Sequence, residues 1–493
     1  MEECPIEKST AIQDKEINLS SRIEERKVIC KINRVAVPFM LLAMFFQKLD
    51  HMTLNLSAML GIYDDVNITH NEFGIAGSLY YLGEISFQLV VVFFLQRFSL
   101  SQVMGIPMLF WGTSMIGSSF ATNFAQLGAC RFCWAFLKRL RTPLFFSLSE
   151  HTIDDPNRAP TLRLYMLDFV QTLSLCMDAV AGHGWSMLLY GIATACFSVL
   201  IILFLPNTPY SKHFHLTTRE KEIVAARIAD NKFSSRPTSI QWDQIAESLK
   251  DPCFYSLFLL SYLCNLPNGA INVFSSQLIR DLGFSELDSI LLNIPRSVYE
   301  VMSYILFVIC TTKVRWCRNH IAYTSGLLSI ISTLSVMLLR VIPVGKAPIV
   351  RLFALTIIPT TYSTLGAQVL ISTNIAGRTK LIFYTTAITF SSTLGHFTGP
   401  LMMAGRESPS YPSALTGYIV ADVLTILLFV HVGWSLSREN ERRLQQQQNH
   451  HQHSEQDQES SLQLQQHTQH GNEDTGDKDD LTDVQQPYFV YRP

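Results

Sequence analysis

Charged residues are scarce in this chain. Of its 493 residues, 16% are Asp, Glu, Lys or Arg and 48% are hydrophobic, whereas a soluble domain carries about 25% charged residues. So little charge cannot coat the surface of a water-soluble protein of this length. The formal net charge of −2 gives no overall field that would attract nucleic acid. The composition therefore predicts a membrane protein with no nucleic-acid partner.

The motifs that mark common enzymes are also missing. We find no P-loop, no G-x-S-x-G and no quartet of metal-ligand residues, so the sequence predicts no enzyme activity, no cofactor and no bound metal. Ten cysteines are scattered along the chain, several of them inside apolar runs, which is typical of packing residues rather than a disulfide framework. Residues 1–34 are polar and charged throughout, so we expect a cytosolic tail rather than a cleaved signal peptide.

Long apolar runs are abundant. A helix that spans a bilayer needs about 20 mostly apolar residues, and about twelve segments meet this criterion. The sequence therefore predicts an all-α membrane protein. The first six segments lie near 36–58, 73–96, 103–121, 126–149, 162–182 and 185–205, and the second six near 254–277, 286–310, 319–339, 348–371, 381–404 and 414–436.

The distribution of Lys and Arg predicts the orientation. Five basic residues lie between 22 and 34, before the first segment, while the loop at 62–71 has none. A basic cluster at 438–443 follows the last segment. Because cytosolic loops are enriched in Lys and Arg, we expect both termini in the cytosol. The sequon Asn67-Ile68-Thr69 then lies outside, where Asn67 can be glycosylated.

A polar stretch at 212–250 divides the twelve segments into two sets of six. Two six-helix halves joined by a long linker are the organisation of the major facilitator fold. Within the linker, Thr218 is the expected N-cap of a short amphipathic helix. A Gln- and His-rich tract at 444–478 is expected to be disordered. The predicted organisation is a tail at 1–34, a first half at 35–206, a linker at 207–252, a second half at 253–437 and a largely disordered cytosolic tail at 438–493.

An ordered series of short motifs resembles one family. They are Leu-Asp-His-Met-Thr-Leu at 49–54, Asn-Leu-Pro-Asn-Gly-Ala-Ile-Asn at 265–272, Asn-Ile-Ala-Gly-Arg-Thr-Lys at 374–380, the cluster at 438–443 and Asp-Leu-Thr-Asp at 480–483. The series is similar to that of fungal major facilitator transporters of the allantoate permease group, in the anion:cation symporter family. The resemblance implies a monomeric plasma-membrane symporter that carries a proton and a small organic anion, such as nicotinate, allantoate or pantothenate.

The chain also departs from that pattern. His51 stands where the family has an arginine, the acid of the second segment is displaced to Glu84, and Lys138-Arg139 replaces a Glu-Ala pair. These changes keep two alternatives open. One is a nutrient receptor that has the same fold and binds without transport, and the other is an exporter of a small metabolite.

The fourth segment carries the candidate substrate-binding residues. Arg131, Lys138 and Arg141 are spaced seven and three apart, so they project from one face of a helix and can attract an anionic substrate. Arg131 is the main candidate because a guanidinium binds a carboxylate through two hydrogen bonds. The alternative is that Lys138 and Arg141 extend their charged ends to the membrane interface.

In the seventh segment, Pro267 and Gly269 lie mid-span and loosen the helix, as transporters do at binding sites. Asn268 and Asn272 are the side chains there that we expect to reach substrate. A packing kink is the alternative interpretation.

Candidate proton-binding residues are Asp50, Glu84 and His396. Ionisable groups inside a membrane usually face a cavity or a partner, so each acid can instead form a structural ion pair with a base of the fourth segment. His396 can titrate near neutral pH or serve as a hydrogen-bonded packing residue. Arg296 and Glu300 have the i, i+4 spacing that favours a pair within one helix.

Overall fold

The computed structural model describes residues 61–88, 100–138, 183–204, 217–222, 241–358, 361–461, 482–484, 491 and 492, with a few more between 27 and 59. Within these residues the regular structure is helical, with no strand. The chain divides into two compact units. The first comprises Met1–Ser239 and Phe284–Val301, and the second comprises Ile240–Gly283 and Met302–Pro493.

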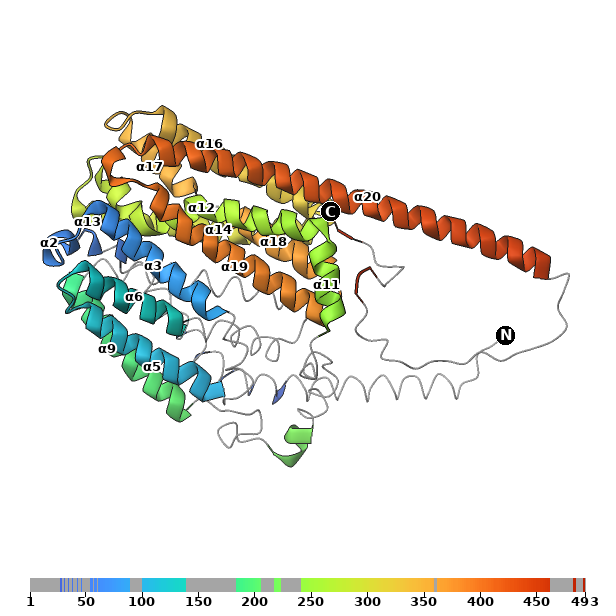
Figure 1. Ribbon diagram of the computed structural model, residues 1–493, viewed down its shortest axis with the longest axis horizontal. Coiled ribbons are helices and arrows are strands. Elements are labelled where there is room, and N and C mark those ends of the chain that lie inside the picture. Colours follow the sequence, from blue (N-terminus) through green and yellow to red (C-terminus); the bar gives the residue numbers. More distant parts are fainter. Residues whose placement is uncertain are drawn as a thin grey trace. The chain divides into compact units, whose positions relative to one another are not determined.

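The first unit contains a layer of packed helices (Figure 1). In it α3 packs against α6, and α5 packs against both α6 and α9. Small residues let α5 and α9 approach closely, because a Cβ on Gly112 would lie 2.8 Å from the backbone nitrogen of Ala195. The helices described in this unit are α2 (Ile62–Asp65), α3 (His70–Gln88), α5 (Leu100–Ser118), α6 (Phe124–Lys138) and α9 (His183–Phe204).

Two helices of the first unit begin with a capping box, in which a threonine and a glutamate satisfy each other's backbone N–H groups. Before α3, the Thr69 N–H donates to Glu72 Oε2 at 2.8 Å. Before the helical residues 218–222, the Thr217 N–H donates to Glu220 Oε2 at 2.7 Å. The N-cap of that helix is therefore Thr217, and the prediction of Thr218 is wrong by one residue, because Glu220 lies three positions after Thr217.

The second unit is a bundle in which α12 packs against α19 and α20, while α16 packs against α17, α18 and α20 (Figure 1). Its buried core includes Leu260, Tyr384 and Phe429. The helices are α11 (Trp242–Lys250), α12 (Pro252–Arg280), α15 (Arg315–Asn319), α16 (Ile321–Val341), α17 (Pro348–Ile357), α18 (Thr361–Asn374), α19 (Arg378–Met402) and α20 (Pro412–Ser461). After α12 come α13 (Glu286–Leu291) and α14 (Asn293–Lys313), and the boundary between the units falls within α14 after Val301.

Glycines bring α12 and α19 into backbone contact. A Cβ on Gly399 would lie 2.2 Å from the carbonyl oxygen of Leu266, and one on Gly395 would lie 2.3 Å from that of Tyr262. The hydroxyl-rich α19 satisfies its side chains within this packing. Ser391, for example, donates to the backbone carbonyl of Phe258 on α12. Small residues and shared hydrogen bonds of this kind are typical of helix interfaces in membranes.

The helices coincide closely with the predicted apolar segments wherever the structure describes them. Six of the described helical stretches are long and apolar enough to cross a membrane. The segment at 162–182 and most of that at 36–58 lie outside the described residues. The six stretches are Met187–Phe204, Pro252–Arg280, Glu286–Lys313, Ile321–Val341, Pro348–Asn374 and Pro412–Gln446.

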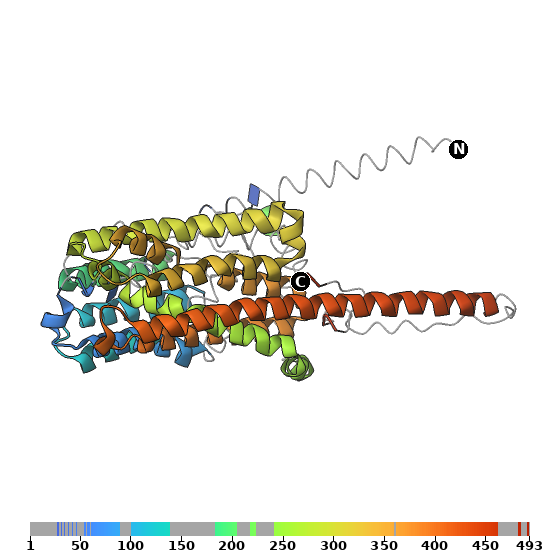
Figure 2. The same cartoon turned by 90° about the horizontal axis from the view of Figure 1, so that it is seen from above.

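The last helix is longer than predicted. α20 runs from Pro412 to Ser461 and continues well beyond the other helices of the second unit (Figure 2). The part of the 444–478 tract up to Ser461 is thus helical rather than disordered. Gln and Glu are good helix formers, and extending an existing helix avoids the cost of nucleation.

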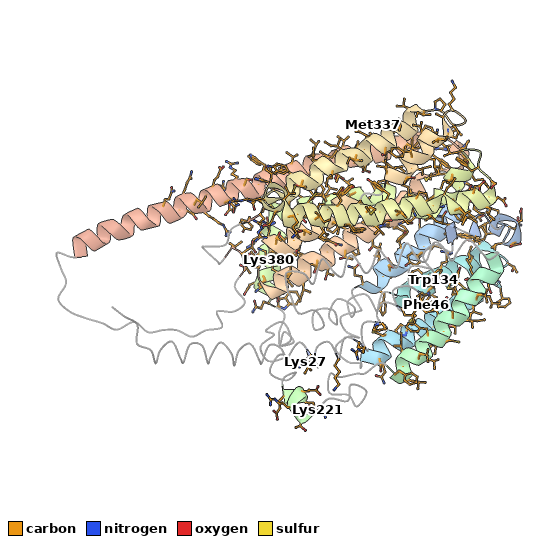
Figure 3. The ribbon with its side chains drawn as sticks, turned by 180° about the vertical axis from the view of Figure 1, so that it is seen from behind. Lys27, Phe46, Trp134, Lys221, Met337 and Lys380 are labelled. Carbon is orange, nitrogen blue, oxygen red and sulfur yellow. The ribbon has the colours of Figure 1, made fainter. Side chains whose placement is uncertain are left out.

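Buried ion pairs tie the C-terminal residues to the second unit. The Lys380 ammonium donates to Glu247 Oε1 and to Asp483 Oδ1, each at 2.7 Å. The Tyr491 hydroxyl donates to the other oxygen of Asp483 at 2.8 Å, and the Arg443 guanidinium lies 4.5 Å from the centre of the Tyr491 ring. Lys380 lies at the end of the bundle from which α20 extends (Figure 3). We call these five residues the tail cluster.

Candidate functional site

Arg131 is buried inside the first unit. It lies on α6 with 3% of its surface exposed, and its guanidinium carbon is 5.2 Å from the centre of the Trp134 ring. Trp134, labelled in Figure 3, is itself 1% exposed. A cation over an indole face is stabilised by the ring's quadrupole. A charge that is kept away from water in this way keeps much of its attraction for an anion.

Glu84 is connected to Arg131 through two aromatic residues. The Tyr80 hydroxyl donates to Glu84 Oε1 at 3.0 Å, one helical turn away on α3. The Tyr80 and Trp134 rings meet nearly at right angles, with ring centres 5.7 Å apart. The order of contacts is therefore Glu84, Tyr80, Trp134 and Arg131. The structure thus links a predicted proton-binding acid to the predicted anion-binding arginine across the α3–α6 interface.

Other predicted residues of the first unit lie at or beyond the limits of the described chain. Lys138 is the last residue of α6. Arg141 and Asp50 lie outside the described residues. Asn67 is exposed, in the turn before α3, with a φ of 53°. The neighbouring Thr69 hydroxyl of its sequon donates to Glu72 Oε2 at 2.8 Å.

In the second unit, Asn268 and Asn272 lie one turn apart on α12 and are both half-buried. The helix continues through Pro267. The adjacent Gly269 packs on the backbone of His396, because a Cβ there would lie 2.6 Å from the His396 Cα. The Nδ1 of His396 lies 2.9 Å from the backbone carbonyl of Ser392 one turn earlier. Gly269 of α12 and His396 of α19 thus lie at the point where the two helices touch.

Arg296 is buried on α14. It is 3% exposed, and the charge of Glu300, four residues later on the same helix, acts on its guanidinium, as the i, i+4 spacing predicts. Its Nε and Nη2 are buried with no hydrogen-bond partner in the described part of the chain. Arg296 is therefore a second buried guanidinium that sequence reasoning assigned to structure alone.

Asp422 was not among the predicted residues. It lies in the apolar part of α20 and is 2% exposed. A lone carboxylate inside the last apolar segment was a visible signal, because such residues are costly in a membrane and usually functional.

Comparison with known proteins defines the class. The sequence model of the Major Facilitator Superfamily matches residues 40–400. An uncharacterised transporter of Schizosaccharomyces pombe is 26% identical over 482 residues, covering 94% of this chain and 91% of its own. The allantoate permease of Saccharomyces cerevisiae is 24% identical, covering 88% and 83%. The crystal structure of the nucleoside transporter NupG is similar in fold, with 12% identity, a TM-score of 0.59 and coverage of 80% and 97%.

The protein is thus a multi-pass membrane transporter rather than an enzyme. It belongs to the Major Facilitator Superfamily.

Proposed function

We propose that this transporter is a proton-coupled symporter of a small organic anion, a carboxylate of the nicotinate, allantoate or pantothenate kind, at the plasma membrane. The observation that carries the proposal is Arg131, a guanidinium buried over Trp134 and connected through Tyr80 to Glu84. The similarity to an allantoate permease supports the same class of substrate.

The chemistry follows from the groups present. A guanidinium binds a carboxylate through two parallel hydrogen bonds, and burial strengthens the attraction. Arg296, whose Nε and Nη2 have no partner within the described residues, is a further candidate for an anionic group. Asn268 and Asn272 supply amide donors and acceptors on α12. Lys138 and Arg141 remain proposed members of the anion site.

Glu84 is the proposed site of the coupled proton, and Asp50 and His396 remain alternatives. When Glu84 takes up a proton, it no longer offsets the positive charge of Arg131, so an anion binds more strongly. Coupling of this kind is reciprocal, so the bound anion also favours protonation of Glu84. Alternating access by the two halves then releases both species on the other side. The proposed orientation places both termini in the cytosol and Asn67 outside.

The test is substitution of Arg131 with uptake and surface expression measured together. Arg131→Ala removes both the positive charge and the two parallel N–H donors of the guanidinium. The binding free energy of the anion should therefore weaken by about 1.5–3 kcal/mol, which lowers the apparent affinity by about one to two orders of magnitude. Arg131→Lys should recover part of this loss, because an ammonium keeps the charge without the bidentate geometry. The control is Arg340→Ala, which removes an exposed arginine that donates to Thr416 and should leave affinity unchanged.

Three results would contradict the proposal. Normal expression with unchanged affinity in Arg131→Ala would remove Arg131 from the site. Loss of folded yield in both variants, with affinity kept by the surviving protein, would make the arginine structural. Binding without accumulation in the unsubstituted protein would favour a receptor.

A further inference from the structure

The hydrogen bonds around Asp422 depend on which of its neighbours carry a hydrogen atom to donate. The Ser332 hydroxyl on α16 lies 3.3 Å from Asp422 Oδ2 and 2.9 Å from the backbone carbonyl oxygen of Ile358. A serine hydroxyl carries one hydrogen, so it can donate fully to one of these two oxygens. Ser332 is 3% exposed, Asp422 2% and Ile358 2%, so bulk water does not supply the missing donor.

The Ile358 carbonyl needs a donor because of its place in the fold. Ile358 is the C-cap of α17, and carbonyls at the end of a helix lack donors from their own helix. The shorter distance is the one between Ser332 and Ile358, which indicates that the serine hydrogen goes to the carbonyl.

If Ser332 donates to Ile358, Asp422 can bond to Ser332 only as a donor. A carboxyl group donates only when it is protonated. The neutral acid thus completes a chain in which Asp422 donates to Ser332 and Ser332 donates to the Ile358 carbonyl. The ionised acid would draw the Ser332 hydrogen to itself and leave the carbonyl without it.

No positive charge compensates an ionised Asp422 in the described part of the chain. The α20 helix packs against α12 and α16, the Ile358 carbonyl at the end of α17 accepts from Ser332, and α12 presents the titratable Cys264 thiol. Among the arginines of these helices, Arg340 donates to Thr416 and Arg351 to the carbonyl of Ile342. Arg280 lies at the far end of α12. None of the three forms an ion pair with Asp422, and a buried carboxylate without a cation is costly.

We propose that Asp422 is a proton-binding site of the second unit and that Ser332 couples its protonation to the backbone at the end of α17. When Asp422 loses its proton, the Ser332 hydroxyl rotates and donates its hydrogen bond to the carboxylate instead of the Ile358 carbonyl. The hydrogen bonding of the carbonyl at the C-terminal end of α17 therefore depends on the proton. A role in transport rests on the proposed proton symport, whereas proton binding by Asp422 does not.

Infrared difference spectroscopy of the purified full chain tests proton binding directly. We expect a carbonyl band of a protonated carboxylic acid at neutral pH that is lost at alkaline pH and is missing in Asp422→Asn. Ser332→Ala should shift the frequency of that band, because it removes the hydrogen-bond acceptor. The control is Asp288→Asn, which removes an exposed carboxylate at the N-terminus of α13 and should leave the band intact.

A band that persists unchanged in Asp422→Asn would overturn the proposal, as would a wild-type spectrum with no protonated acid. If Asp422→Asn does not fold, the shift in Ser332→Ala decides, and an unchanged frequency there counts against the proposal. Proton-independent uptake together with the expected band would refute the proposed symport and leave the proton site standing. Loss of pH dependence of uptake in Asp422→Asn would extend the site to coupling.

Discussion

Replacing Lys380 with Met removes the ammonium at the centre of the tail cluster while keeping most of the side-chain volume. The Lys380 side chain is 1% exposed and that of Asp483 is 6% exposed. Removing one partner of a buried pair costs about 3–5 kcal/mol, because the other charge stays buried. Glu247 is 25% exposed and can turn to water, so we expect the lower end, about 3 kcal/mol.

The loss should appear as local opening of the C-terminal residues. The Tyr491 N–H donates to Asn440 Oδ1 at 2.9 Å, so its hydrogen exchange reports whether this segment is bound. A cost of about 3 kcal/mol raises the exchange rate through local opening by about two orders of magnitude. Lys346→Met, at an exposed loop position, is the matched control and should leave the rate unchanged. Equal protection of Tyr491 in Lys380→Met and the unsubstituted protein would refute this account of the cluster.

The pH dependence of the cluster has a definite sign. Burial lowers the pKa of Lys380, but the hydrogen bonds and charges of Asp483 and Glu247 outweigh it, so the net pKa lies above that of an ordinary lysine. A group whose pKa is higher in the folded than in the unfolded protein stabilises the fold fully at pH values below its unfolded-state pKa. This stabilisation is lost as the pH rises through its folded-state pKa. Titration of Lys380 should therefore leave Tyr491 protection unchanged at neutral pH and reduce it only in strongly alkaline solution.

Two further substitutions test the packing and the site. Gly399→Ala should lower the free energy of unfolding by about 1–3 kcal/mol, because the new Cβ would overlap the Leu266 carbonyl. Thermal unfolding in detergent measures this loss. The control is Gly117→Ala, whose Cβ would lie 3.7 Å from the nearest atom, a sulfur. Tyr80→Phe removes the hydrogen bond to Glu84, so it should shift the pH dependence of uptake and leave the folded yield unchanged. An unchanged pH profile would show that Tyr80 takes no part in proton coupling.

Much of the fold could be predicted because apolar length is a local property of the sequence. Even α19, which is rich in Thr and Ser, was found at its predicted place. The predicted segment at 348–371 likewise corresponds to the apolar stretch Pro348–Asn374. The extension of α20 to Ser461 was missed because polar composition was taken to indicate disorder.

The candidate site could be predicted only in part, because its contacts are tertiary. The spacing of Arg296 and Glu300 predicts their interaction within one helix, but it does not predict the burial of the Arg296 guanidinium. Glu247 and Asp483 lie 133 and 103 residues from Lys380, so no local pattern encodes the tail cluster. The link from Glu84 to Arg131 likewise depends on how α3 packs against α6, which the sequence does not state.

Uptake by the purified protein in liposomes is the most direct test of proton-coupled transport of an organic anion. A panel of labelled organic acids should be offered with and without an inward proton gradient, while a dye inside the vesicles reports internal pH. For a proton symporter of an organic anion, one or more carboxylates should accumulate against their own gradient when protons flow inward. Internal pH should fall in step with uptake, and a neutral amide analogue should not accumulate. Equal uptake with and without the proton gradient, or preference for the neutral analogue over every acid, would contradict proton-coupled transport of an organic anion.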